Sequence, residues 1–323
     1  MISSPHHPPA RVRVAGAVLA AVGGVTLAVQ GRVNGQLGHV MHDGVFAALI
    51  SFGIGTVLLV TAVAVTPSAR AGLVRLRTSV RAGRLRFWQC LGGTCGAFLV
   101  TCQGLTVAIL GVAVFTIAVV AGQVVASLAV DRAGLGPAAP QPVTLPRAAG
   151  AALAVVAVVI AVSDHSAVEA GGLWWALLPG VAGLGLAWQA AVNGLVRVES
   201  DNVVVPTLVN FSVGTVALLL AAAVDLIARG LPGALPAVWW YYVGGPLGII
   251  TILTAVAAVR FTGVLLLGLA SVAGQLTGAV LLDVVVPTTG GLGASSVIGT
   301  AITMVAVGIA AIRPRERDER MAG

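Results

Sequence analysis

Apolar stretches of about 20 residues recur along the whole chain and limit the folds that it can adopt. Each stretch is long enough to cross a bilayer core of about 30 Å as a helix. Charged residues make up only 9% of the chain, whereas soluble domains carry roughly 25%. Membrane-spanning strands would give alternating segments of about ten residues, and the sequence has none. The sequence therefore predicts an all-α integral membrane protein.

The apolar stretches predict ten transmembrane helices separated by turn residues. Pro67 closes the second, Pro287 follows the ninth, and the Pro-rich segment "GLGPAAPQPVTLP" separates the fourth from the fifth. The first stretch continues to Val29 with no A-x-A site after it, so we expect it to be retained rather than cleaved as a signal peptide. The predicted spans lie near residues 14–35, 45–65, 88–108, 111–130, 147–163, 173–195, 203–224, 238–258, 263–282 and 294–312.

The basic residues predict the orientation of these helices. All 18 are Arg, and most lie in a few segments such as "RAGLVRLRTSVRAGRLR", which we expect to be a loop. With the N-terminus in the cytoplasm, 16 of them fall on the inside, and only Arg32 and Arg229 fall outside. Cytoplasmic loops are enriched in Lys and Arg, so the net charge of +7 indicates topology rather than a nucleic-acid partner. Both tails, 1–13 and 313–323, are predicted to be cytoplasmic.

The two halves of the chain repeat each other. A shift of 159 residues aligns positions 30–60 with 11 identities and no gap, and includes the Gln, Asn and Gly of "QGRVNG" and "QAAVNG". A shift of 152 aligns "GGTCG" with "GGPLG", Gly111 with Gly263, and Asp131 with Asp283. Each half, 14–163 and 173–312, holds five helices, so the second half enters the membrane from the opposite side. The predicted fold is two inverted five-helix repeats, an arrangement common in secondary transporters.

At these motifs the chain resembles a known family. "LAVQGRVNGQLG…FAALISFGIGTVLLV" and "LAWQAAVNGLV…VPTLVNFSVGTVALLL" are similar to the signature of YdcZ-type proteins of the drug/metabolite transporter superfamily. Known units are often single five-helix chains, and this sequence resembles a fused tandem of two over residues 14–312. The resemblance implies a ten-helix carrier for small metabolites in a bacterial inner membrane, and it specifies no substrate.

Paired amides are the first candidate site. Gln30 and Asn34 lie four residues apart and share one helix face. Their repeat mates are Gln189 and Asn193. An amide that faces lipid loses its water partners, so each pair must face the bundle or a wet cavity. They are interpreted either as substrate-binding gates, one towards each side, or as helix–helix hydrogen bonds, and the sequence favours neither.

Further polar residues match across the repeat. Gln123 and Gln275 lie near the middle of their spans, where such folds place their substrate. They are interpreted either as substrate contacts or as packing residues of the bundle. Ser51 and Asn210 stand beside phenylalanines and could line a cavity for an organic molecule, although core packing is the stronger interpretation. Gln103 ranks lower, because its matched position holds an alanine.

The titratable residues give weaker signals. Asp131 and Asp283 are matched and fall at predicted helix ends, where solvated acids are the ordinary interpretation and gating or proton coupling is the alternative. No charged residue lies deep in a predicted span, which argues against the usual intramembrane proton relay. His39 and His42 are expected to be solvated, and the three cysteines to be packing residues. We expect no metal and no cofactor.

These features together predict a secondary transporter of a small neutral or zwitterionic organic metabolite or drug-like solute, and the family resemblance implies that it is an exporter. An enzyme would need nucleophiles, bases or metal ligands that converge in the membrane, and the spans offer only amides, hydroxyls and thiols. A channel, or a scaffold or sensor without transport turnover, is the alternative. The expected partners are the solute and membrane lipid, with no nucleic acid; a homodimer stays open.

Overall fold

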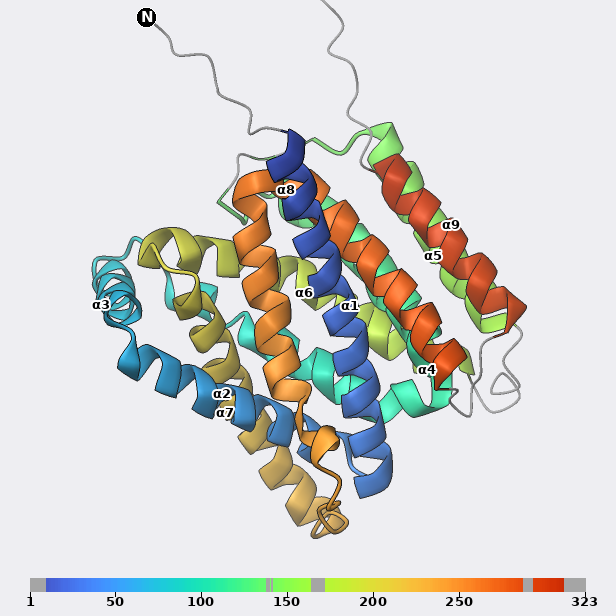
Figure 1. Cartoon of the computed structure of the whole chain (residues 1–323), viewed down its shortest axis with the longest axis horizontal. Coiled ribbons are helices and arrows are strands. Elements are labelled where there is room, and N and C mark those ends of the chain that lie inside the picture. Colours follow the sequence, from blue (N-terminus) through green and yellow to red (C-terminus); the bar gives the residue numbers. More distant parts are fainter. Residues whose placement is uncertain (1–9, 138–139, 141, 164–171, 287–292, 311–323) are drawn as a thin grey trace, which may run out of the picture.

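The computed structural model describes residues 10–137, 140, 142–163, 172–286 and 293–310. Every regular element within these residues is a helix (Figure 1). The α-helices are α1 (Ala10–Met41), α2 (Gly44–Val65), α3 (Pro67–Arg81), α4 (Gly93–Arg132), α5 (Leu145–Ser163), α6 (Gly172–Ser200), α7 (Val204–Arg229), α8 (Gly244–Val285) and α9 (Ala294–Ala310). Two short 3-10 helices, η1 (Phe87–Cys90) and η3 (Trp239–Tyr242), precede α4 and α8.

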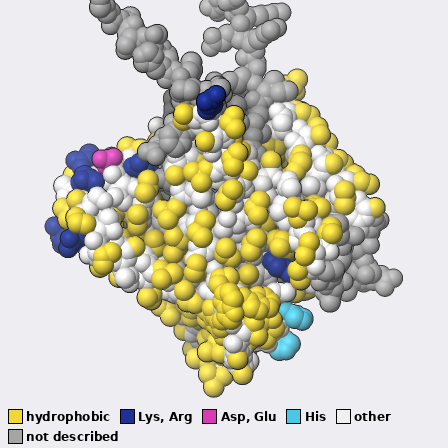
Figure 2. Space-filling model, in the orientation of Figure 1, with side chains coloured by type: hydrophobic (Ala, Val, Ile, Leu, Met, Phe, Trp, Pro, Cys, Tyr) yellow, Lys and Arg dark blue, Asp and Glu magenta, His cyan; other side chains and the backbone are white. Residues whose placement is uncertain are grey.

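Five helical segments in the described part of the chain are long and apolar enough to cross a membrane. They are Val14–Met41, Gly44–Val65, Phe87–Arg132, Trp174–Ser200 and Val204–Arg229, and shorter apolar helices accompany them. The surface agrees with this, because hydrophobic side chains cover most of the face seen in Figure 2. The all-helical membrane fold expected from the composition is therefore present.

Two helices are too long for a single crossing. α4 has 40 residues and α8 has 42, and a straight helix of that length would extend about 60 Å, twice the bilayer core. The backbone of α4 breaks at Gly111, which has φ 77° and ψ 162°, a conformation that residues with a Cβ rarely adopt. Figure 1 shows both α4 and α8 folding back on themselves as hairpins. Each hairpin contains two of the spans predicted from the sequence.

The turns also repeat between the halves. His42, before α2, has φ 52°, and Asp201, its mate 159 residues later, has φ 46° before α7. The side chain of the next residue accepts hydrogen bonds from the first turn of the helix in both cases. Asp43 accepts hydrogen bonds from the backbone of Val45 and Phe46 at 2.9 and 3.0 Å, and Asn202 accepts from Val204 at 2.9 Å. Asp and Asn are preferred helix caps, so the same turn is built from different residues.

The helices of the two halves pack against each other in matched pairs. α1 packs along α8 and α6 along α4, while α2 packs on α7 and α5 on α9 (Figure 1). Glycines permit the two long contacts. A Cβ on Gly24 would stand 2.0 Å from the Ser271 carbonyl, and a Cβ on Gly183 would stand 2.1 Å from the Val119 carbonyl. Small residues let membrane helices approach closely. The two contacts are equivalent in the repeat, because Gly183 follows Gly24 by 159 residues and Ser271 follows Val119 by 152.

The segment after α2, expected as a loop, is a helix in the structure. Pro67 occupies the first turn of α3, where its missing N–H costs nothing. α3 buries one face, formed by Ala69, Gly72, Leu76 and Ser79. Arginines gather at this edge of the molecule (Figure 2). The loop predicted between the second and third spans therefore contains a helix, because the segment has an amphipathic 3.6-residue pattern.

Candidate functional site

The two halves meet at a pair of phenylalanines. The rings of Phe52 on α2 and Phe211 on α7 lie 4.9 Å apart between centroids, and the two residues are repeat mates. A Cβ on Gly55 would stand 2.2 Å from the Phe211 ring, and a Cβ on Gly214 would stand 2.3 Å from the Phe52 ring. Each half thus supplies one ring and the glycine that accommodates its partner. We call Phe52 and Phe211 the phenylalanine pair.

A second matched contact lies one turn further along the same helices. The hydroxyls of Thr56 and Thr215, again 159 residues apart, are hydrogen-bonded at 2.7 Å. A residue that contacts its own repeat mate lies on the axis that relates the halves. The phenylalanine pair and this threonine bond therefore mark a pseudo-two-fold axis between α2 and α7.

One cluster of buried polar groups lies beside this axis. Its side chains come from the first half, and they face the start of α8 in the second half. Asn34 is fully buried and donates from Nδ2 to Gln103 Oε1 at 2.7 Å. Its Oδ1 and the Ser51 hydroxyl have no hydrogen-bond partner among the described residues. Both point at Gly244, where an added Cβ would stand 2.1 Å from Asn34 Oδ1 and 2.7 Å from Ser51 Oγ. Gln30 Nε2 faces Gly248, one turn on. We call these residues the Gly244 cluster.

The second half has a matching cluster at the start of α4. Gln189 Oε1 and Asn210 Oδ1 are buried without a hydrogen-bond partner in the part of the chain that the structure describes. Both face Gly96, where an added Cβ would stand 3.0 and 3.5 Å from these oxygens and 3.3 Å from the Phe52 ring. Asn193 Oδ1 faces Gly92, the preceding turn of the chain. We call this the Gly96 cluster. The structure thus brings six predicted residues into two related groups around the phenylalanine pair: Gln30, Asn34, Ser51, Gln189, Asn193 and Asn210.

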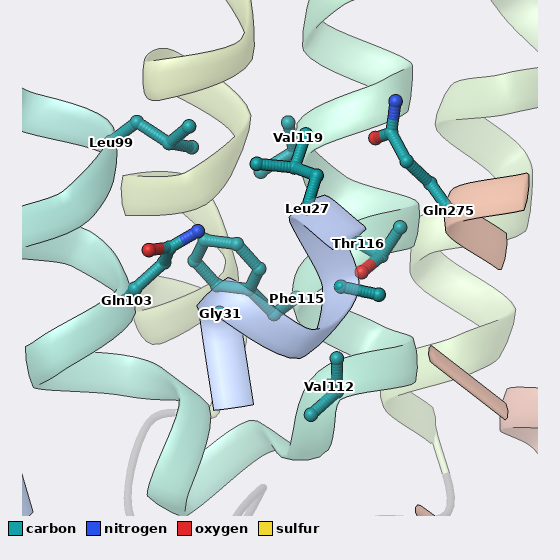
Figure 3. A pocket seen from close by; sticks show the side chains of 10 residues that line it. Leu27, Gly31, Leu99, Gln103, Val112, Phe115, Thr116, Val119 and Gln275 are labelled. Carbon is teal, nitrogen blue, oxygen red and sulfur yellow. The ribbon is translucent and has the colours of Figure 1, made fainter. Parts of the chain in front are cut away.

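A small cavity lies next to the Gly244 cluster, between α1, α4 and α8. Gln103, Thr116 and Gln275 supply its polar lining, and Phe115 and aliphatic side chains supply the rest (Figure 3). The space open to the centre of a water-sized sphere is about 10 Å³, which is room for roughly one water. Gln275 thus lines an internal cavity. Gln123 is half-buried and is not among the residues that line it.

Gln103 is the site residue that the repeat pattern ranked too low. It is 1% exposed, bonds Asn34 and lines the cavity. Its matched position in α8 is Ala255, so a search for paired residues passes over it. The signal available was simpler, because an amide in a long apolar helix needs a partner in the bundle. The two halves are consequently related in shape and different in their polar interior.

The matched acids occupy different environments. Asp283 is 2% exposed and accepts hydrogen bonds from the backbone of Val112 and Ala113 at 3.1 and 2.7 Å. It therefore caps the second half of α4 at the Gly111 break, and its charge also acts on the buried Arg32. The expectation that Asp283 is a solvated acid at a loop edge was wrong. Asp131 agrees with that expectation better, because its side chain is 44% exposed and pairs with Arg147.

The other reactive residues form no site. The rings of His39 and His42 lie 6.2 Å apart between centroids, and the described residues contain no group of three potential metal ligands. Cys90, Cys95 and Cys102 are free thiols, and burial is complete only for Cys102. Besides the buried charged residues Arg32 and Asp283, the described interior offers amides, hydroxyls and aromatic rings, which can bind and orient a polar organic molecule through hydrogen bonds and apolar contact.

Apolar helices of membrane-crossing length around an amide-lined interior define a multi-pass helical membrane protein. A family model described as "Putative inner membrane exporter, YdcZ" matches residues 15–160 and again residues 174–311. The two matched regions cover more than half of the chain, so the chain belongs to this family of inner-membrane exporters, as its motifs predicted. None of the curated proteins matches the chain. The family is one of transporters and not of enzymes.

Proposed function

We propose that the protein is a secondary transporter that moves a small organic solute across the inner membrane by alternating access. In this proposal the ten predicted spans form two inverted five-helix repeats, with the α4 and α8 hairpins supplying two spans each. The observation that carries the proposal is the exchange symmetry at the phenylalanine pair, where each half presents the same ring, glycine and polar cluster to the other. Inverted repeats of this kind are typical of carriers that alternate between two openings.

The closed interior supports a cycle with an occluded state. The cavity beside Gln103 and Gln275 holds about one water, and both polar clusters are packed against glycines. A solute larger than water enters only if α1 and α8, or α4 and α6, move apart. Because these two contacts are repeat mates, the same motion in either half opens opposite sides of the membrane. The neutral lining suits a neutral or zwitterionic solute better than a strongly ionic one, and the family supports export as the direction.

The proposed orientation puts both termini and α3 in the cytoplasm, following the distribution of arginines. Thr78 is an exposed residue of α3, so a cysteine at this position reports its side. With Cys90, Cys95 and Cys102 replaced by alanine, Thr78→Cys should react with an impermeant maleimide only in permeabilised cells. Strong labelling of intact cells would reverse the orientation.

Two buried mates provide a test of alternating access that needs no known solute. Thr106 on α4 and Ala258 on α8 are both fully buried, and each lies five residues before its repeat's matched glycine, Gly111 or Gly263. In the same cysteine-free background, Thr106→Cys should label only from outside and Ala258→Cys only from inside. A bulky maleimide on one cysteine holds that side open, so it should slow labelling of the other in the double variant.

The alternative functions give different results in this experiment. In a channel, both cysteines line one open path, so modification of the first leaves the second reactive. In a scaffold or sensor without turnover, neither position becomes accessible on the time scale of transport. Independent labelling, or no labelling from one side, would therefore contradict the alternating-access mechanism.

A further inference from the structure

We infer that the transported solute presents a hydrogen-bond-donating nitrogen group, such as an amine, next to an apolar body, and that the Gly244 and Gly96 clusters bind that group beside the phenylalanine pair. This inference rests on the proposed transport function and specifies the substrate class. It comes from the chemistry of the buried atoms that lack partners.

The fully buried side-chain atoms of the two clusters that lack a hydrogen-bond partner are oxygens. They are Asn34 Oδ1, Ser51 Oγ, Gln189 Oε1 and Asn210 Oδ1. Asn34, Ser51 and Asn210 are 0, 2 and 2% exposed, so bulk water does not reach them. An amide oxygen is only an acceptor, and a buried acceptor without a donor is costly. A ligand that brings donors removes this cost when it binds.

The local contacts favour this orientation of the amides. Asn34 Nδ2 is engaged by Gln103, which leaves its oxygen facing Gly244. Gln189 and Asn210 direct their oxygens at Gly96, and Asn193 directs its oxygen at Gly92. A glycine Cα carries hydrogens that an oxygen tolerates as weak C–H···O contacts, whereas an NH₂ group gains nothing there. Four amide oxygens therefore face glycines, against two amide nitrogens, that of Gln30 facing Gly248 and that of Gln103 facing Gly31.

The rings beside these oxygens select the same kind of ligand. A cationic amine over a phenylalanine face gains electrostatic attraction from the ring, and the apolar body of the ligand gains contact with both rings. A carboxylate or phosphate would instead need several donors, whereas the fully buried unpaired groups offer one, the Ser51 hydroxyl, beside three amide oxygens that only accept. The clusters contain no carboxylate, so they bind an amine through dipoles and rings rather than through an ion pair.

The test uses one apolar body with three polar groups: 2-phenylethylamine, 2-phenylethanol and phenylacetate. Binding of each to the purified full-length protein in detergent is measured by calorimetry, and thermal unfolding is followed in parallel. The amine should bind most tightly and phenylacetate most weakly. Asn210→Leu removes one acceptor and should weaken amine binding about tenfold or more, as expected for a lost hydrogen bond to a charged group. The same change should leave phenylacetate unaffected.

Two further variants separate the binding role from a structural one. Asn210→Ser keeps an oxygen at this position, as Ser51 does at the matched one, and should recover most of the amine affinity. Thr56→Val removes a hydroxyl near the same rings that already has its own partner in Thr215, so amine affinity should persist. Both variants also show whether a loss in Asn210→Leu follows from misfolding.

Three results would overturn the inference: phenylacetate binding as tightly as the amine, no binding of the amine, or an Asn210→Leu variant with unchanged amine affinity. None of these bears on alternating access, which the paired cysteines at 106 and 258 test separately. If the protein alternates but prefers phenylacetate, the proposed transport mechanism stands and the inferred preference for a donor group fails. If the protein binds the amine but does not alternate, the inferred binding site stands and the proposed transport mechanism fails.

Discussion

At the scale of single residues, the glycines of α2 give a direct stability test. A Cβ on Gly55 would stand 2.2 Å from the Phe211 ring, whereas a Cβ on Gly53 would meet nothing within 4 Å. Gly55→Ala should therefore destabilise the protein by about 1–3 kcal/mol, the usual cost of overpacking. Gly53→Ala should be neutral or stabilising by about 0.5–1 kcal/mol, because alanine favours the helix. Reversible unfolding in mixed micelles measures both, and equal effects would mean that the ring contact is not tight.

The sequence predicted most residues of the candidate site and missed the contacts between them. Six amide and hydroxyl positions followed from repeat matching and from the cost of placing an amide in lipid. The hydrogen bond between Asn34 and Gln103 was not predicted, because the position that matches Gln103 in the second half holds Ala255. The burial of Asp283 could not be read from its place at a helix end. It depends on the fold of α4, which puts the Gly111 break against that carboxylate.

At the scale of elements, the two matched acids should differ in their effect on stability. Asp283→Ala would leave the backbone donors of Val112 and Ala113 buried and unpaired. At about 1–3 kcal/mol for each donor, the loss should be about 2–6 kcal/mol. Asp131→Ala removes a partly exposed pair with Arg147 and should cost about 0–1 kcal/mol. Hydrogen exchange at residues 112 and 113 should rise only in the first variant.

Equal losses in the two variants would mean that Asp283 is not the cap of the broken helix. The comparison is informative because the residues are repeat mates in different surroundings. It also illustrates which elements the sequence can predict. The apolar runs predicted the helices that are buried in the bundle or covered by lipid, whereas α3 was mistaken for a loop because its arginines dominate the segment. Its buried face of Ala69, Gly72, Leu76 and Ser79 has the spacing of an amphipathic helix.

At the scale of the whole molecule, the repeat supports the proposal that one chain forms two openings of similar architecture. α1 with α8 and α6 with α4 are equivalent contacts, so in the proposed mechanism the opening of either contact uses the same kind of helix packing. The polar interiors differ, because the bond from Asn34 to Gln103 has no counterpart at Ala255. If the protein alternates as proposed, we expect this asymmetry to favour closure of one side over the other.

The amide pairs should then shift the equilibrium between openings in opposite directions. Loss of one hydrogen bond between membrane helices, about 0.6 kcal/mol on average, changes a population ratio roughly threefold. Gln30→Leu with Asn34→Leu breaks the bond to Gln103 and should weaken closure around α1 and α8. Gln189→Leu with Asn193→Leu replaces the side chains that contact Gly96 and Gly92 and should weaken closure around α6 and α4. Labelling of cysteines at 106 and 258 should therefore change in opposite senses, and by more in the first double variant, which breaks the bond to Gln103. If both double variants change labelling in the same sense, or only lower the unfolding temperature, the pairs hold helices together and do not act as gates.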